Sequence, residues 1–467
     1  MRIIKLRLIT TNAQSHTLLC RLSLPLLALL WILVASLASC NKETFYATGN
    51  DVAIDFSCDT LAFDTVFTAM GSTTQMVKVY NHSGDIVRFN SIALQKGRSS
   101  RFRLNVDGDT SMVVRNLELA DNDSIFIFVQ VNINPDDQNS PFIVEDHIIF
   151  NYDGGEKQLP LSAYGRNAIY HIPDHTLQNS DGSIPTDAFG NPYNYSIIDC
   201  DNWRHDRPHV IVGYAVVDSR STLNLQAGDE LYFYNDAVLW VYDSASLKVQ
   251  GSAEQPVLFT SVRHDGWYDF LPGQWGYIWL SSGSHGNTIN HALIENGYVG
   301  ILADTNVDNQ PTLRISNSII RSASYAGLIA QTAYIEADNL LVHTCGTVDI
   351  ALQYGGRYSF RNCTLANYWN YSSRKGPCAI FNNRYTYENN IYLYPFTANF
   401  TDCIIYGSMS DGELTLDLDE TASPVVQLNH CLIRGGEWDE DPLFSDPDNG
   451  DFSLQENSPA TGIGWQK

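Results

Sequence analysis

The densest group of side chains that could do acid–base chemistry lies in the seven-residue segment 263–269, RHDGWYD. It combines two carboxylates, two basic side chains and two aromatic rings. A polysaccharide-cleaving enzyme uses such groups to donate protons, to accept them and to hold a sugar ring. A solvated loop between two structural elements has the same composition, and we favour that interpretation. The catalytic candidates are Arg263, His264, Asp265 and Asp269.

Aromatic residues form a second group, between residues 368 and 394. Flat rings interleaved with Asn and Arg suit stacking on pyranose rings, and several together would give an extended glycan surface. The alternative, which we favour, is that these rings pack over the flank of the fold and become buried. With the two rings of the first segment included, the candidate glycan-stacking residues are Trp267, Tyr268, Tyr368, Trp369 and Tyr371.

Neither common mechanism of polysaccharide cleavage has strong support in the sequence. A lyase needs a base and cations or Ca²⁺ beside the substrate carboxylate, yet residues 209–436 contain only Lys248 and Lys375 as lysines. The net charge of -24 would also repel a polyuronate and nucleic acid. A hydrolase needs two or three carboxylates about 5–10 Å apart. The loop carboxylates that could meet in space are Asp265, Asp269, Asp304 and Asp308. We predict no cofactor and no metal; bound calcium is the alternative, and no motif in the sequence indicates it.

A short phrase that recurs through the second half of the chain indicates the elements that would position these groups. It consists of an apolar residue, a spacer, then Asn, Asp or His, a small or thiol residue, and two apolar residues. The steps between its third positions are 26, 22, 23, 40 and 28 residues, a spacing typical of the stacked coils of a parallel β-solenoid. The 40-residue step is either two coils or one coil with a long loop. We predict a structural ladder at a turn, formed by His291, Asn317, Asn339, Asn362, Asp402 and His430.

The number and spacing of the cysteines favour a packing role for their side chains over metal binding or reactivity. Of nine, Cys20 and Cys40 lie in the N-terminal segment, which leaves seven with no CxxC pair, so neither a zinc site nor a full disulfide framework is indicated. Cys363, Cys403 and Cys431 share one position of the repeat. We expect them to form a buried stack of small apolar side chains.

The first forty residues predict export and lipidation. Basic residues precede an apolar run, Leu22–Val34, that is short for a membrane span and suits a secretory signal. The run ends in Leu-Ala-Ser-Cys at residues 37–40, which resembles the lipobox of bacterial lipoproteins and implies that Cys40 is lipidated. The following Asn41-Lys42-Glu43 partly resembles a surface-export signal of Bacteroidota. We therefore expect a lipid-anchored outer-membrane protein that faces the cell exterior.

The mature chain contains two regions with different sequence patterns. Residues 50–166 contain alternating runs separated by turn residues, the pattern of an antiparallel sandwich of about seven strands. Residues from 209 onward carry short, closely spaced apolar runs with Gly or Asn at the corners. The phrase LPGQWGYIWL at 271–280 and the ending DPLFSDP at 441–447 resemble the right-handed parallel β-helix lipoproteins of Bacteroidota, whose members carry an N-terminal Ig-like domain. That resemblance covers almost all of the mature chain and implies architecture and surface placement, not an activity.

These patterns predict an all-β protein in which an Ig-like antiparallel sandwich is followed by a right-handed parallel β-helix. The expected divisions are a signal peptide (1–39), a tether (40–49), the Ig-like sandwich (50–166), a linker or solenoid cap (167–208), the β-helix (209–436) and a C-terminal capping tail (437–467). We expect a non-catalytic binding or structural scaffold whose partners are the membrane, through its lipid, and glycans or surface proteins. The alternatives are a β-helix polysaccharide lyase or glycoside hydrolase, and a passive surface component without a specific ligand.

Overall fold

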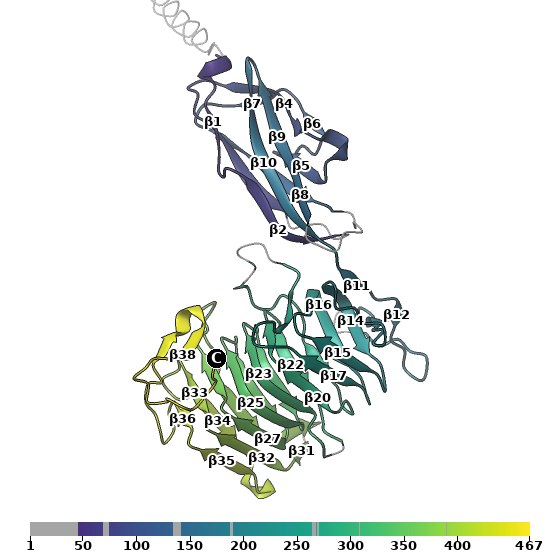
Figure 1. The fold of residues 1–467 in the computed structure, drawn as a ribbon, viewed down its shortest axis with the longest axis vertical. Coiled ribbons are helices and arrows are strands. Elements are labelled where there is room, and N and C mark those ends of the chain that lie inside the picture. The colour runs from purple at the N-terminus through teal and green to yellow at the C-terminus, as the bar shows by residue number, and fades with distance from the viewer. Residues whose placement is uncertain are drawn as a thin grey trace, which may run out of the picture.

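The computed structural model describes residues 45–68, 74–133, 142–186, 190–263, 268, 270–307, 309–388 and 390–467 (Figure 1). Within these residues the chain is all-β and contains no α-helix. Its strands form one sheet of 24 strands, one of six, one of four and two of two strands. None of the described residues forms a helix long and apolar enough to cross a membrane. Cys40 and the predicted signal and export residues lie outside the described residues.

The four- and six-stranded sheets pack together around one apolar cluster, which draws buried side chains from both. Strand β8 (Ser124–Val131) shows why: every second side chain is buried, as expected for a strand with one face on a core. The four-stranded sheet also contains β1 (Ile54–Phe56), β3 (Gln75–Asn81) and β5 (Phe102–Val106). The six-stranded sheet contains β2 (Leu61–Phe67), β4 (Val87–Leu94), β6 (Val113–Val114), β7 (Leu117–Leu119), β9 (Phe142–Tyr152) and β10 (Gly155–Arg166).

The 24-stranded sheet begins with a small edge group. Strands β11 (Ile169–His171) and β13 (Asn194–Ile197) both pair in parallel with β14 (His209–Val217), and β12 (His175–Thr176) pairs antiparallel with β13. The Trp203 ring stacks on His209, with ring centroids 3.5 Å apart. Strands β11, β12 and β13 and the Trp203 ring therefore lie at the first edge of the sheet.

From β14 onward the strands stack in three rows, because each pairs in parallel with a strand one repeat later. One row precedes the recurring phrase: β15 (Thr222–Gln226), β17 (Ser246–Gln250), β20 (Asn287–Asn290), β23 (Leu313–Arg321), β25 (Tyr334–His343), β27 (Gly356–Arg361), β32 (Phe396–Thr401) and β35 (Val425–Asn429). A second row follows the ladder position of the phrase. It begins with β16 (Glu230–Val241), β18 (Val257–Ser261) and β21 (Ala292–Glu295), continues through the second halves of β23 and β25, and ends with β28 (Thr364–Asn367), β33 (Ile404–Gly407) and β36 (Leu432–Ile433). The third row runs through β14, β16, β19 (Ile278–Leu280), β22 (Val299–Ala303), β24 (Ala326–Gln331), β26 (Val348–Gln353), β29 (Ala379–Asn382) and β34 (Leu414–Asp417).

The space between the rows is filled by one apolar cluster that extends from Ile198 to Ile433. Like side chains stack on one another there; the rings of Phe360 and Phe400, for example, lie 4.7 Å apart and nearly parallel. Burying such large apolar side chains contributes about 1.5–3 kcal/mol each. The core therefore depends on register, since a slip of one residue would turn these rings outward.

The 40-residue step of the repeat is one coil that carries insertions. Strand β27 pairs directly with β32, Gly356 opposite Phe396, so no additional coil lies between them. The insertions are the segment 368–378 and a hairpin of two fully exposed strands, β30 (Arg384–Tyr387) and β31 (Asn390–Leu393).

The C-terminal segment lies along the flank of the second row. Its hairpin, β37 (Phe444–Asp446) and β38 (Asp451–Leu454), packs Phe444 and Phe452 on outward-facing apolar side chains of that row, such as Leu341 and Ile404. The Gln466 backbone N–H then donates to the Asn339 side chain, 127 residues earlier. The segment thus runs back over several coils and shields an apolar surface (Figure 1).

Candidate functional site

The first predicted catalytic segment is described only in part. His264, Asp265, Trp267 and Asp269 lie outside the described residues, as does Asp308. The Arg263 guanidinium lies over the Tyr268 ring, 3.1 Å from its centroid, so these two candidates contact each other. The side chain of Asp304 accepts a hydrogen bond from Trp279 Nε1 at 2.7 Å, and burial raises its pKa.

The six predicted ladder residues occupy equivalent positions of consecutive coils. Each stands between residues that pair in register, and each has a left-handed backbone with φ between 47° and 53°. Side chains join neighbouring members: Asn339 Nδ2 donates to Asn317 Oδ1 at 3.0 Å, and His430 Nδ1 lies 2.6 Å from Asp402 Oδ1. Asn and Asp tolerate this conformation better than other residues with a side chain, because their short polar groups bond locally.

The cysteines of the next register position are buried and free. The thiols of Cys363, Cys403 and Cys431 each donate to the carbonyl two residues earlier, at 3.1–3.3 Å. Burial, and after it the hydrogen bond with the Cys363 thiol, raises the pKa of Cys403, so its reactive thiolate form is disfavoured. In the described residues no group of three or more His, Cys, Asp and Glu side chains is placed to hold a metal ion.

A polar cleft of about 400 Å³ lies on the second row, beside Phe270 and beside Asn370 and Tyr371 of the second predicted segment. Its floor consists of Glu295, Arg321 and His343, which stand directly opposite one another on β21, β23 and β25. Each floor residue is followed directly by a residue with a left-handed backbone: Asn296, Ser322 and Thr344, with φ of 65°, 54° and 53°. The strands of all three coils therefore end at the same place, beside the cleft.

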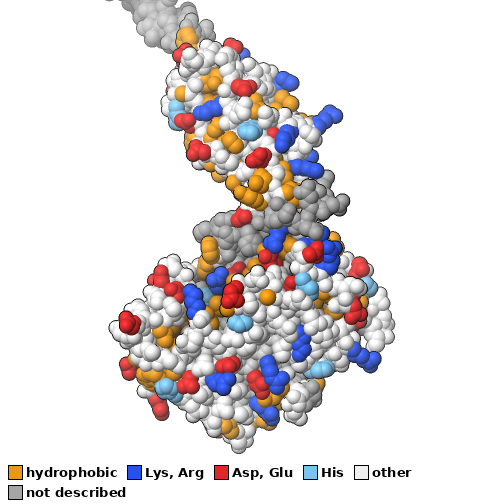
Figure 2. Space-filling view, in the orientation of Figure 1, with side chains coloured by type: hydrophobic (Ala, Val, Ile, Leu, Met, Phe, Trp, Pro, Cys, Tyr) orange, Lys and Arg blue, Asp and Glu red, His pale blue; other side chains and the backbone are white. Residues whose placement is uncertain are grey.

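The charges of the floor are paired. Arg321 Nε and Nη2 both donate to Glu295 Oε2, at 2.8 and 2.6 Å. Burial lowers the pKa of His343 to about 3, so this side chain is neutral at pH 7, and its ring packs on Phe452. Figure 2 shows acidic and basic side chains interspersed over the visible face rather than gathered by sign.

Two walls enclose this floor. On one side Tyr371, whose hydroxyl donates to the Phe270 carbonyl at 2.6 Å, brings together segments 101 residues apart. Phe270 and Tyr371 are 67% and 42% exposed, so both rings are accessible. The opposite wall is the turn Asp448–Gly450 of the C-terminal segment.

The remaining stacking candidates differ in exposure. The ring of Trp369 packs on Tyr371, with centroids 5.0 Å apart, and its Nε1 donates to Ser372 Oγ. The ring of Tyr368 lies against Phe444 and Phe452 of the C-terminal segment. Of the residues 368–371, Tyr371 therefore presents the accessible ring at the cleft.

A second polar surface, of about 560 Å³, lies on the outer face of the first row. It carries two ion pairs between neighbouring coils, Arg314 to Glu336 at 2.7 Å and Arg361 to Asp338 at 2.8 Å. These exposed pairs join adjacent coils, and each contributes little to stability on its own.

Sequence inspection did not find the floor residues, although a signal for them was present. Glu295, Arg321 and His343 each stand four residues after a ladder position, so the repeat that predicts the ladder also aligns them. Their different chemical types conceal this alignment. The approach of Phe270 to Tyr371 has no such signal, because it joins two insertions.

Comparisons with known proteins give no relative from which an activity could be transferred. No family model and no curated protein matches the chain. Among solved structures, the catalytic unit of a GH87 α-1,3-glucanase from Streptomyces thermodiastaticus strain HF3-3 is 11% identical, covers 71% of this chain and 62% of its own, and has a TM-score of 0.23. A family 123 glycoside hydrolase from Clostridium perfringens is 8% identical over 27% of this chain and 30% of its own, with a TM-score of 0.19.

A protein of unknown function from Porphyromonas gingivalis W83 is 11% identical over 27% of this chain and 51% of its own, with a TM-score of 0.19. The chain thus covers less than two thirds of each of these three structures. TM-scores so far below 0.5 do not establish a shared fold. The chemistry of the cleft must therefore be judged from its own residues.

Proposed function

We propose that this protein is a lipid-anchored outer-membrane protein of Bacteroidota that binds neutral glycans at the cell surface without cleaving them. In this proposal the two packed sheets are an Ig-like spacer, and the three rows of strands are a right-handed parallel β-helix that carries the binding cleft. Residues 40–49 are the tether, residues 167–208 cap the first edge, and the ladder residues are structural.

The observation that carries the proposal is the composition of the cleft. Two accessible rings, Phe270 and Tyr371, stand over a floor whose charges are already paired. Sugars are bound by stacking of their apolar faces on rings, with amides and charged groups bonded to their hydroxyls. Asn370 and Asn449 line the two walls and supply amides for this purpose. A neutral glycan also avoids repulsion by a chain of net charge -24.

The same geometry favours binding over turnover. A glycosidase needs one carboxyl group that is protonated at working pH and a second that is free to act as base or nucleophile. Glu295, the carboxylate of the floor, accepts two hydrogen bonds from Arg321 on a single oxygen, so that oxygen is already engaged within the protein. His343 is neutral but buried under Phe452, which limits its contact with a substrate.

A glycan array followed by calorimetric titration would test the proposal on the chain from residue 45, which retains every described strand. We expect binding of a neutral glycan, and Tyr371→Ala to weaken it about tenfold, because a lost ring contact is worth roughly 1.4 kcal/mol. Tyr387→Ala is the matched control: Tyr387 is 53% exposed, but it lies on the hairpin β30–β31 outside the cleft. Release of new reducing ends or unsaturated products would refute the non-catalytic role and support the hydrolase or lyase alternative.

Membrane attachment can be tested separately in cells. Cys40→Ala should move the full chain from the membrane fraction to the soluble fraction, because each buried acyl methylene contributes about 0.8 kcal/mol to anchoring. Protease added to intact cells should cleave the wild-type chain if it faces outward. A Cys40→Ala chain that still fractionates with membranes would contradict lipidation at this residue.

A further inference from the structure

Strand β5 is an open edge of the four-stranded sheet. The strand order is β1-β3-β8-β5, so β8 is the one strand that pairs with β5 in the part of the chain that the structure describes. The backbone N–H of Asp107 donates to Phe126, and that of Asn132 donates to Arg101, both at 2.9 Å. Because hydrogen-bonded pairs alternate along an antiparallel ladder, the odd-numbered residues of β5 face β8 and the even-numbered residues face the open side.

Two of the three even-numbered residues are satisfied locally. The N–H of Phe102 donates to Ser100 Oγ and its carbonyl accepts from Arg103 Nη1, while Val106 exchanges hydrogen bonds with Asp109. In the middle, Leu104 has no hydrogen-bond partner for its backbone groups among the residues that the structure describes. An open edge with such groups is a template for one more strand.

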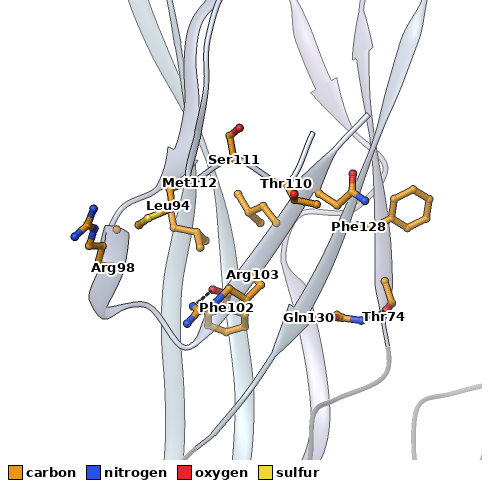
Figure 3. Close-up of a pocket in the computed structure, with 13 residues that line it drawn as sticks. Thr74, Leu94, Arg98, Phe102, Arg103, Thr110, Ser111, Met112, Phe128 and Gln130 are labelled. Atoms are coloured by element: carbon orange, nitrogen blue, oxygen red, sulfur yellow. Dashed lines mark hydrogen bonds between the residues drawn. The ribbon is translucent and has the colours of Figure 1, made fainter. Parts of the chain in front are cut away.

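A groove of about 660 Å³ surrounds this edge (Figure 3). Leu94 and Met112 lie on one side of Arg103, and Phe128 and Gln130 lie on the other. Met112 and Phe128 are 53% and 39% exposed. Successive side chains of an added strand would point alternately toward these two apolar surfaces.

The groove is cationic within an acidic chain. Among the described residues, its two charged lining residues are Arg98, exposed on the 3₁₀ turn Gly97–Ser99, and Arg103 on β5, and none of its described lining residues is a carboxylate. The chain as a whole carries a net charge of -24. Charge complementarity therefore favours an acidic occupant, which would pair with the two guanidinium groups.

We propose that the β5 edge is a binding site for an extended acidic peptide segment of a partner protein, which adds as a fifth strand beside Leu104. The backbone of the segment bonds to the N–H and carbonyl of Leu104, its apolar side chains contact Met112 and Phe128, and its carboxylates pair with Arg98 and Arg103. This site is separate from the glycan cleft and does not depend on it.

The test uses the full-length chain and a fluorescent peptide of repeating Val-Val-Glu-Glu, because this order places both valine and glutamate on each face of an extended strand. We expect saturable binding in fluorescence anisotropy and slower hydrogen exchange of the Leu104 amide in the complex. A peptide with lysine in place of glutamate should bind at least tenfold more weakly, and so should a peptide N-methylated at alternate residues, because it lacks the N–H groups that pair with the strand. Free glutamate polymer without valine tests for charge attraction alone.

Arg98→Glu should weaken binding at least fivefold. Arg98 is exposed, so this change should leave folding intact, and Arg115→Glu, an exposed arginine outside the groove, should bind like wild type. Equal binding of the methylated and unmethylated peptides, or of the glutamate polymer and the valine–glutamate peptide, would overturn strand addition. Absence of binding, or occupation of the groove by fatty acid or glycan in place of peptide, would also overturn it.

Discussion

The buried carboxyl group of Asp349 gives a sharp test of the packing in the 24-stranded sheet. Asp349 lies on β26 and is fully buried, and no N–H or O–H group donates to either carboxyl oxygen among the described residues. The thiols of Cys345 and Cys378 lie beside it, and burial raises its pKa to about 8. The folded protein therefore keeps Asp349 protonated at pH 7, where an unfolded chain would ionise it.

The direction in which stability changes with pH follows from proton binding at Asp349. Between about pH 4 and pH 8 the folded state binds more protons at this residue than the unfolded state, so Asp349 makes the protein less stable as pH rises. At pH 7 this cost is ~4 kcal/mol, from roughly three pKa units at 1.36 kcal/mol each. Asn cannot ionise, but its amide would lack partners, at a constant cost of about 1–3 kcal/mol. The stability of Asp349→Asn relative to wild type should therefore rise by ~4 kcal/mol from pH 4 to pH 7.

Urea unfolding followed by tryptophan fluorescence measures this difference selectively, because residues 45–166 contain no Trp and the signal comes from the rest of the chain. The difference should level off above pH 8, where Asp349 has released its proton in both the folded and the unfolded wild-type chain. Asp411→Asn is the control, since Asp411 is exposed on the same part of the fold. A difference that stays constant or falls with rising pH would show that Asp349 is ionised in the folded state.

Three further substitutions test the row of floor residues, the ladder and the buried ion pair. Between pH 6.5 and pH 5 the unfolded wild-type chain binds a proton at His343 that the buried ring of the folded protein does not bind, so the free energy of unfolding should fall by about 2 kcal/mol. His343→Gln should remove this fall, which urea unfolding at both pH values measures. Asn339→Ala should lower the free energy of unfolding by roughly 1–2 kcal/mol because of its left-handed backbone, and further because its hydrogen bonds to Gln466 are lost. Asn339→Gly should recover the backbone part in the same urea unfolding experiment. Arg374→Met should lower the free energy of unfolding by about 3–5 kcal/mol because it leaves the Glu413 carboxylate buried and without its ion-pair partner. Adding Glu413→Gln should restore part of this stability. Equal thermal stability of the single and the double variant would contradict the reasoning.

The sequence predicted the features that depend on local backbone conformation. Asn317, Asn339 and Asn362 could be found because a turn with positive φ admits few residue types, and that restriction recurs once per coil. The all-β class and the parallel stacking followed from short β-branched runs at this spacing. The meaning of the 40-residue step could not be decided, because a coil and an insertion can have the same length.

The cleft depends on contacts that no local pattern encodes. The hydrogen bond from Tyr371 to Phe270 joins residues 101 apart, and the opposite wall, Asp448–Gly450, comes from the C-terminal segment. That segment was expected to cap the fold, whereas its described contacts lie along the flank of the second row. Its apolar residues match outward-facing side chains of that row, and only the folded arrangement shows which of them are outward.

The repeat itself explains how one fold can hold a constant frame and a variable site. The ladder position has a left-handed backbone, which favours Asn and Asp, and all six coils carry Asn, Asp or His there. Four residues later the chain is still extended in five successive coils, and that position carries Glu295, Arg321, His343, Ala366 and Tyr406. Because any side chain is compatible with an extended backbone, this row can change chemistry from coil to coil without disturbing the stack. The side chains of the cleft floor therefore occupy a position whose residue type the fold does not constrain.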